Sequence, residues 1–149
     1  MTQEWHRGGY YISTDKSRLD LAVIHNFLTT SYWAAGIPIE TVKKSLEHSL
    51  NFGVYEEGKQ VGFARVITDY ATFAYIGDVF ILEDHRRQGL SKWLMQVIAD
   101  HAELQGLRRW VLLTRDAHGL YRKTGFMEPV NPERYMEKIF PDVYKNGEM

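Results

Sequence analysis

The sequence predicts an α/β protein with a mixed central sheet of about seven strands, flanked by about four helices. The first observation is that short runs of β-branched and aromatic residues alternate with amphipathic stretches. The second is the succession of strand, helix and strand over residues 73–114, which requires a parallel crossover. Together they give the element order β-α-α-β-β-β-α-β-α-β-β.

The N-terminal third is predicted to hold one strand and two helices. Residues 10–14 (YYIST) are the predicted strand, and Asp15 and Ser17 then offer N-caps for the first helix. The apolar side of that helix carries Leu19, Val23, Ile24, Phe27 and Leu28. Pro38, a residue favoured in the first turn of a helix, opens the second one.

A hairpin is predicted next. Residues 52–56 and 61–68 have the composition of strands, and the short connection between them contains Gly58. Glycine in a tight connection is a strong hairpin signal, because the favoured two-residue turns need a left-handed backbone.

A strand over residues 73–81 leads into a basic turn and then a helix. Leu90, Leu94, Val97, Ile98 and Leu104 recur at helical spacing. The turn carries the pattern Arg86-x-x-Gly89-x-Ser91. Free N–H groups at a helix start attract anions, and glycine has no Cβ to keep a phosphate away. We interpret the turn as a pyrophosphate site; an ordinary turn with surface arginines is the alternative.

The last third is predicted to complete the sheet. Gly106 stands where a helix C-cap belongs, and residues 109–114 (RWVLLT) are predicted as a buried strand. Asp116 can cap a short helix. Two closing strands are predicted over residues 126–128 and 135–139.

Composition and charge exclude several classes of protein. The 149 residues suit one domain spanning residues 1–149. There is no cysteine, which excludes disulfides, thiolate metal sites and a cysteine nucleophile. A net charge of −1 argues against a nucleic-acid partner. With no apolar signal core and no membrane-length stretch, we expect a cytoplasmic protein without a membrane partner.

The strand, the Arg86-x-x-Gly89-x-Ser91 turn and the following helix resemble the acyl-CoA-binding motif of the GNAT superfamily of N-acetyltransferases. That family's pattern is Gln/Arg-x-x-Gly-x-Gly/Ala, and Ser91 stands where Gly or Ala is usual. The element order is also the family's, over nearly the whole chain. The resemblance therefore implies a GNAT fold, with acetyl-CoA as co-substrate. Cofactor binding is accordingly predicted for Val79, Phe80, Ile81, Arg86, Arg87, Gln88, Gly89, Leu90, Ser91, Thr114 and Lys123. Lys123 is included because its charge could attract the CoA phosphates, and a solvated charged face is the alternative for it.

Residues 117–126 (AHGLYRKTGF) are similar to the family's fourth conserved region, where Leu-Tyr precedes Gly-Phe. By that resemblance Tyr121 is the general acid that protonates the departing CoA thiolate. A phenol with a pKa near 10 is still protonated at neutral pH. A packing aromatic at a helix end is the alternative. Two positions depart from the family pattern: Thr114 replaces an asparagine, and Glu83 replaces a proline shortly after Ile81.

The acceptor amine needs a proton acceptor, because an amine with a pKa near 10.4 is mostly protonated at pH 7. Asp78 is the candidate general base, since a carboxylate inside an apolar strand is unusual unless it is partnered or functional. Strict alternation places it on the face opposite Val79 and Ile81, unless Gly77 marks a bulge. Anchoring the loop through backbone N–H groups is the alternative role.

Tyr32 and Trp33 lie between the two N-terminal helices, in a segment that overhangs the acceptor pocket in the family. They could form an aromatic wall for the substrate or pack on the core. His85 and His118 are interpreted as exposed loop residues. Neither has the paired spacing of a metal site, so no metal is expected.

Residues and resemblance together predict an acyl-CoA-dependent N-acyltransferase. It would transfer acetyl from acetyl-CoA to a primary amine of a small molecule or peptide, by direct attack in a ternary complex. The backbone near Ile81 would polarise the thioester carbonyl. The alternatives are transfer to a non-amine acceptor such as a hydroxyl, a catalytically silent CoA-binding regulatory module, and an unrelated nucleotide-binding protein. The resemblance also leaves a homodimer possible.

Overall fold

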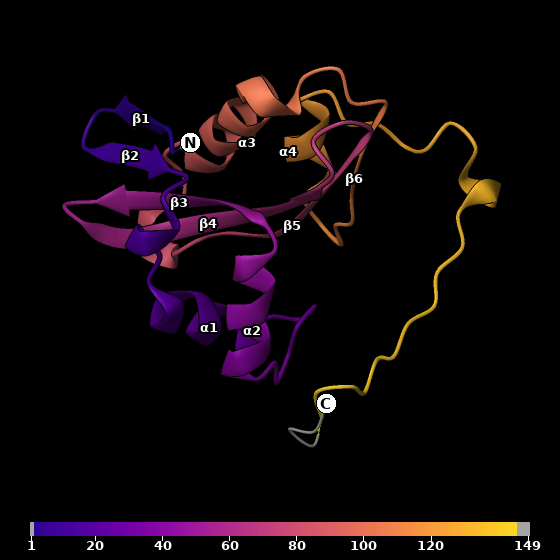
Figure 1. The fold of residues 1–149 in the computed structure, drawn as a ribbon, viewed down its shortest axis with the longest axis horizontal. Coiled ribbons are helices and arrows are strands. Elements are labelled where there is room, and N and C mark those ends of the chain that lie inside the picture. The colour runs from indigo at the N-terminus through magenta and orange to yellow at the C-terminus, as the bar shows by residue number, and fades with distance from the viewer. Residues whose placement is uncertain (1, 146–149) are drawn as a thin grey trace.

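The strands of the central sheet lie side by side in the order in which the chain makes them (Figure 1). The computed structural model describes residues 2–145. Its strands are β1 (Glu4–Arg7), β2 (Tyr10–Ser13), β3 (Leu50–Glu56), β4 (Lys59–Thr68), β5 (Phe73–Ile81) and β6 (Arg109–Leu112). Neighbours are antiparallel except β5 and β6, which are parallel. This confirms the mixed α/β sheet and its crossover, with six strands for the about seven predicted.

Helices cover both faces of the sheet (Figure 1). The α-helices are α1 (Leu21–Thr29), α2 (Ile39–Glu47), α3 (Leu90–Asp100) and α4 (His118–Arg122). Short 3₁₀ turns occupy Lys16–Arg18, Glu83–His85, Ala102–Leu104 and Pro132–Arg134. In the figure α1 and α2 lie below the sheet, whereas α3 and α4 lie above it. None of the described helices is long and apolar enough to cross a membrane.

The sheet separates two apolar clusters, because successive strand residues point to opposite faces. The cluster under α3 includes Phe52, Val66, Ile76, Leu94 and Ile98. The cluster under α1 and α2 includes Ile24, Leu28, Val42, Phe63 and Phe80. Full burial of one such side chain stabilises the fold by roughly 1.5–3 kcal/mol. These clusters therefore fix β4 and β5, the strands that position the site described below.

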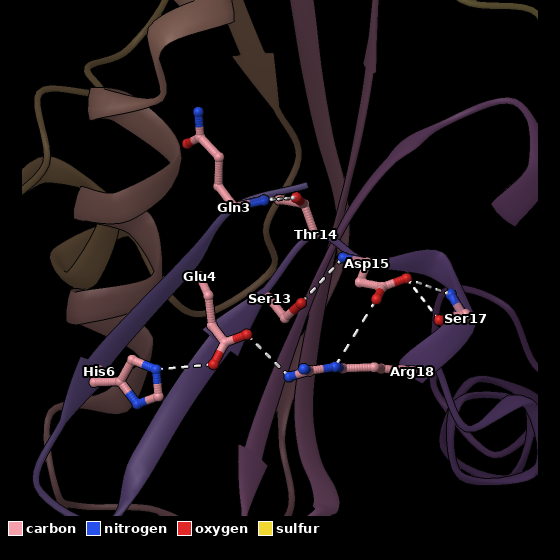
Figure 2. Close-up of polar contacts among 8 residues, drawn as sticks. All are labelled: Gln3, Glu4, His6, Ser13, Thr14, Asp15, Ser17 and Arg18. Carbon is pink, nitrogen blue, oxygen red and sulfur yellow. Dashed lines mark hydrogen bonds and ion pairs between the residues drawn. The ribbon is translucent and has the colours of Figure 1, made fainter. Parts of the chain in front are cut away.

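β1 was not predicted, because its sequence EWHR has no apolar run. It pairs with β2 as the first edge of the sheet. Figure 2 shows the polar contacts there: the Gln3 backbone N–H donates to Thr14 Oγ1 at 2.9 Å, and the Glu4 carboxylate pairs with His6 and Arg18. Exposed ion pairs contribute little stability, so backbone pairing with β2 and packing of Trp5 against the cluster under α3 hold this hairpin.

The two predicted closing strands are wrong. Residues 126–128 and 135–139 form no strand, and the chain beyond α4 runs out from the body as an extended segment before returning (Figure 1). The predicted buried strand 109–114 is also shorter than expected, ending at Leu112, and none of its residues is buried. β6 is therefore the outer edge of the sheet within residues 2–145, and an edge strand with one neighbour is less buried than an inner one.

The residues at the helix ends match the predicted caps only in part. Asp20 caps α1 by accepting the Val23 N–H, whereas Asp15 caps only the 3₁₀ turn before it. Asp116 does not cap α4, whose N-cap residue makes no side-chain hydrogen bond. Gly106 adopts a left-handed φ of 80°, but it follows a 3₁₀ turn rather than ending α3 itself. The hairpin turn at Gly58, with a φ of 79°, is confirmed.

Candidate active site

β5 and β6 separate in the middle of β5. Only residues 73–76 of β5 pair with residues 109–112 of β6. Beyond them the pairing of β5 with β4 shifts, from Arg65 opposite Gly77 to Phe63 opposite Phe80. Over this stretch β5 has one residue more than β4, which is a β-bulge and bends the strand. Asp78 lies in this bulge with a left-handed φ of 56°. The bulge predicted at Gly77 is therefore confirmed, with the left-handed residue one position later.

A cavity of about 270 Å³ lies where β5 ends and α3 begins. Its lining contains Ile81, Arg86, Arg87, Gly89, Leu90, Ser91 and Lys123, all predicted cofactor-binding residues, together with His85, Lys92 and Leu120. We call this cavity the cradle. The turn that was singled out in the sequence therefore lines a concave surface, and Leu120 of α4 and its C-cap residue Lys123 complete the lining.

The start of α3 opens onto the cradle without a cap. Gly89 is the N-cap residue, with a φ of 77°, and no side chain accepts the first N–H groups of the helix. Arg87, two residues earlier, also has a left-handed φ, of 66°. Unpartnered N–H groups and the helix dipole together attract an anion. The lining arginines and lysines add positive charge around the same point.

Side-chain contacts hold the loop before α3 in place. Arg86 Nε donates to the Ile81 carbonyl at 2.8 Å, so this guanidinium braces the turn that it was expected to charge. The Tyr10 hydroxyl lies 3.0 Å from His85 Nδ1 and within 3.5 Å of Gln88 Oε1. Gln88, which was predicted to bind the cofactor, thus also contacts Tyr10 of β2 and helps to hold the loop.

Arg7 of the unpredicted strand β1 also reaches this loop. Its guanidinium donates to the Gly89 carbonyl at 3.4 Å and lies over the Trp93 ring. Sequence reasoning missed it, because nothing in a polar N-terminal segment signals a contact 82 residues away.

Four predicted cofactor-binding residues do not line the cradle: Gln88, described above, and Val79, Phe80 and Thr114. The Phe80 ring is buried on the opposite face of the sheet, stacked on Phe27 with centroids 4.1 Å apart. Val79 packs at the edge of the cluster under α3. The Thr114 hydroxyl accepts the Ala117 N–H at 3.0 Å and so shapes the loop before α4.

Tyr121 is half-buried on α4, and it lies in the sequence between Leu120 and the C-cap residue Lys123, which both line the cradle. It packs against the cluster under α3 and meets the Phe126 ring edge-on. Burial raises the pKa of the Tyr121 phenol, and the Tyr32 phenol and the Asp116 carboxylate raise this pKa further. The phenol is therefore protonated at neutral pH, and Tyr32 lies near enough to influence it.

Asp78 is held by two side chains from different elements. Arg65 Nε on β4 donates to Oδ2 at 2.8 Å, and Trp33 Nε1 donates to Oδ1 at 2.8 Å. Arg65 is itself fixed by a hydrogen bond to the Ser49 hydroxyl. The Asp78 side chain is 13% exposed, so its charge is compensated by Arg65 but is still accessible. The structure thus brings together Asp78 and Trp33, which the sequence had singled out separately.

Tyr32 docks the same segment onto the loop before α4. The Arg115 backbone N–H donates to the Tyr32 hydroxyl at 3.2 Å, and the Arg115 guanidinium lies 3.9 Å above the Tyr32 ring. Tyr32 and Trp33 meet edge-on with centroids 5.1 Å apart, and both remain partly exposed. This aromatic pair therefore connects the bulge in β5 to the loop that follows β6.

Tyr75 is a residue of this region that sequence reasoning missed. Its ring lies over Gly77, where an added Cβ would come within 3.0 Å of it. Burial raises the pKa of Tyr75, the Asp78 carboxylate adds to this, and Arg65 opposes it. The available signal was its place two residues before a glycine, but an aromatic residue in a strand is more commonly part of the core.

No cluster of three or more potential metal ligands occurs among residues 2–145. The region instead offers a positively charged cradle, a half-buried phenol on α4 and a carboxylate on β5 that is paired with Arg65. Such a set suits transfer of a group from a phosphate-bearing donor, with proton movement at both reacting atoms.

Comparison with known proteins gives matches of one kind. The family model for the Acetyltransferase (GNAT) family matches residues 14–126. A candidate acetyltransferase from Gibberella zeae is 35% identical over 144 residues, which cover 81% of this chain and 80% of that protein.

Two solved structures illustrate the similarity of the fold. A crystal structure of a candidate GNAT acetyltransferase from Xanthomonas campestris pv. campestris is 51% identical, with a TM-score of 0.88 over 91% of this chain and 96% of that one. A GNAT family acetyltransferase from Elizabethkingia anophelis, solved with acetyl-CoA bound, is 15% identical, with a TM-score of 0.64 over 90% of each chain. At that identity the second likeness concerns the fold alone.

Proposed function

Since the chain belongs to the GNAT family of acetyltransferases, we propose that it transfers an acetyl group from acetyl-CoA to a primary amine by direct attack in a ternary complex. The whole sequence would act as one domain. The amine nitrogen bonds to the thioester carbonyl carbon and the carbon–sulfur bond breaks. The nitrogen loses a proton to a base, and the departing thiolate gains one from an acid.

The cradle is the observation that carries this proposal. Acetyl-CoA has a pyrophosphate, and the uncapped start of α3 offers N–H groups and a favourable dipole at the same point as Arg87, Lys92 and Lys123. At Gly89 an added Cβ would meet only the Arg7 guanidinium, at 3.4 Å, so the backbone there is open to a ligand. The residues present therefore fit the donor.

The gap between β5 and β6 supports a place for the pantetheine arm and the thioester. Beyond Ile76 the side of β5 that would face β6 has no ladder partner among the described residues. Backbone N–H groups of such a strand can donate to a carbonyl oxygen as charge develops on it. Ile81 at the end of β5 and Leu120 of α4 also line the cradle.

Tyr121 is the proposed general acid. Burial raises its pKa, which keeps the proton on the phenol until a thiolate forms beside it. General acid catalysis of this kind contributes typically about 10²–10⁴-fold to a rate. The role rests on position and protonation together, because Tyr121 is the sequence neighbour of Leu120, which lines the cradle, and because its phenol is protonated at neutral pH.

Asp78 is the proposed base for the amine. Both oxygens accept one hydrogen bond each, and each carboxylate oxygen keeps a second lone pair for a proton or a bridging water. The competing role is structural, since the same two bonds fix the bulge and the Trp33 segment. Tyr32, Trp33 and Tyr75 would form the wall of the acceptor pocket.

The test is release of free thiol from acetyl-CoA against a panel of amines, beside a calorimetric titration of acetyl-CoA. Binding with turnover of at least one amine is the expected result. Turnover of an alcohol alone would indicate a hydroxyl acceptor. Binding without turnover of any acceptor would indicate a regulatory module, and absence of binding would contradict the assignment of the cradle.

A further inference from the structure

His85 lines the cradle, although the sequence led us to interpret it as an exposed loop residue. That interpretation is wrong, because only 22% of the His85 side chain is exposed. The residue ends the 3₁₀ turn Glu83–His85, directly before the Arg86-x-x-Gly89-x-Ser91 pattern. The proposed function uses the cradle for the pyrophosphate of the donor and gives this imidazole no role.

The hydrogen bond and the ion pair of the His85 ring are both at one nitrogen. The Tyr10 hydroxyl of β2 lies 3.0 Å from Nδ1, and the Tyr10 ring meets the His85 ring edge-on. The Glu56 carboxylate of β3 lies 3.7 Å from the same nitrogen. Gln88 in turn contacts the Tyr10 hydroxyl. Side chains of two neighbouring strands therefore hold the ring at Nδ1.

The other nitrogen of the ring is available to a ligand. His85 Nε2 has no hydrogen-bond partner among residues 2–145, and it is not sealed in the interior as Nε2 of His101 is. An N–H at this position is a hydrogen-bond donor. Because His85 forms part of the cradle lining and Nδ1 is already engaged, Nε2 is the atom of this ring that can meet an anion there.

We propose that His85 binds the pyrophosphate of the donor through Nε2 and takes up a proton from solvent as it does so. The inference rests on the proposed function, because it needs the cradle to hold acetyl-CoA. In the charged imidazole both nitrogens are donors. Nε2–H then donates to a phosphate oxygen, and Nδ1–H donates to the Tyr10 oxygen or to the Glu56 carboxylate. Hydrogen bonds of this charge-assisted kind are roughly twice as strong as neutral ones.

The charges around His85 explain why the proton arrives with the ligand. Four cationic side chains line the same cavity and oppose a further positive charge there: Arg86, Arg87, Lys92 and Lys123. A bound pyrophosphate brings negative charge into the cavity and so favours the charged imidazole. Glu56 favours it from the opposite side of the ring, with or without ligand. Glu83 and Asp84, on the turn itself, are exposed, so solvent screens their effect.

Calorimetric titration measures this proton directly. Dephospho-CoA is the probe, because it keeps the pyrophosphate but lacks the 3′-phosphate, a monoester that itself titrates at about pH 6. Titrations at pH 7 in HEPES and in Tris, whose heats of ionisation differ, give the protons taken up per ligand bound. We expect net uptake by the wild-type protein and loss of most of it in His85→Gln. His48→Gln, at an exposed histidine after α2, is the matched control and should keep the uptake.

The pH dependence of affinity is the second readout. Affinity for dephospho-CoA should rise as the pH falls from 8.5 to 6.5, because the bound state holds more protons. His85→Gln should lower it at least about tenfold at pH 6.5, where a hydrogen bond from a charged group is lost, and much less at pH 8.5. Tyr10→Phe removes the contact to Nδ1 but keeps the histidine, so it should retain the rise.

Two outcomes would overturn the inference and leave the proposed function intact. One is equal proton uptake in the wild type and His85→Gln. The other is a loss of affinity in Tyr10→Phe that matches His85→Gln at every pH, since His85 would then only anchor the loop. Failure of acetyl-CoA itself to bind would overturn both the inference and the proposed function. None of these readouts depends on acetyl transfer.

Discussion

The Tyr121 hydroxyl is the single group whose removal should separate catalysis from binding. Tyr121→Phe keeps the ring that packs on Phe126, so α4 should remain folded. We expect turnover to fall by about 10²–10⁴-fold while acetyl-CoA affinity changes little. The high-pH limb of the rate profile should also flatten, because no phenolic proton is left to lose. Thiol release and calorimetry measure the two quantities.

Tyr70→Phe is the matched control, since Tyr70 is an exposed tyrosine before β5 and away from α4. It should leave both quantities unchanged. If Tyr121→Phe keeps full turnover, Tyr121 is a packing residue. If it loses acetyl-CoA binding instead, the ring is a wall of the donor site.

Asp78→Asn distinguishes a general base for the amine from a residue that only anchors the bulge in β5. The amide keeps the size of the carboxylate but accepts no proton, so a base role predicts slow turnover at neutral pH. Turnover should recover partly at high pH, where the amine is already free. Arg65→Gln is the control: it breaks the same ion pair but keeps the carboxylate, and should not produce that recovery. A uniform loss at every pH with a lower melting temperature would show that Asp78 only anchors the bulge.

The start of α3 is the element on which donor binding depends. Gly89→Glu places bulk and negative charge at the N–H groups, so acetyl-CoA should no longer raise the melting temperature. The substitution also strains a backbone with a φ of 77°, and Gly106→Glu applies the same strain at a φ of 80° far from the cradle. The control should lose stability but keep the ligand-induced shift. A shift that persists in Gly89→Glu would refute the cradle.

Elements defined by local signals were predictable from the sequence. The apolar spacing of α3, the turn at Gly58 and the strand β5 each depend on residues close together in the chain. β1 and the lack of strands over residues 127–143 were not predictable, because strand formation depends on pairing with residues far away in the chain. The polar β1 is a strand because β2 offers it an edge, whereas residues 135–139 pair with no strand among residues 2–145.

The assembly of the candidate site belongs to the whole molecule. Asp78, Trp33 and Tyr121 were each singled out from local sequence, but the bond from Trp33 to Asp78 joins residues 45 positions apart. Arg115 and Tyr32, which stack on each other, are even farther apart in the sequence. Contacts of this kind depend on how α1, β5 and α4 are placed relative to one another. No single stretch of sequence predicts that placement.

Acid should destabilise the protein through His101. This residue is 2% exposed, its Nδ1 accepts the Glu103 N–H, and its Nε2 has no partner within residues 2–145. Burial lowers its pKa below the unfolded value of about 6.5. The unfolded chain therefore binds a proton first, so stability is full above pH 6.5 and falls as the pH drops below it. Melting temperatures between pH 7.5 and 5.5 measure this.

His101→Leu should flatten that pH dependence whatever it does to stability at pH 7.5. Carboxylates such as Asp69, whose pKa is lowered by hydrogen bonds from Thr72 and Ala71, lose their contribution at lower pH, below about 4. An unchanged slope between pH 7.5 and 5.5 in His101→Leu would assign the effect to other groups.

The extra residue in β5 restricts how this protein can diverge. Substitution at Asp78 changes one side chain, whereas deletion of the residue would pair β4 and β5 regularly and turn each residue on one side of it to the opposite face. Phe80 would then leave its stack on Phe27. Descendants of this gene can exchange the aromatic wall for a new acceptor, but between residues 73 and 81 they should accumulate replacements and no gaps.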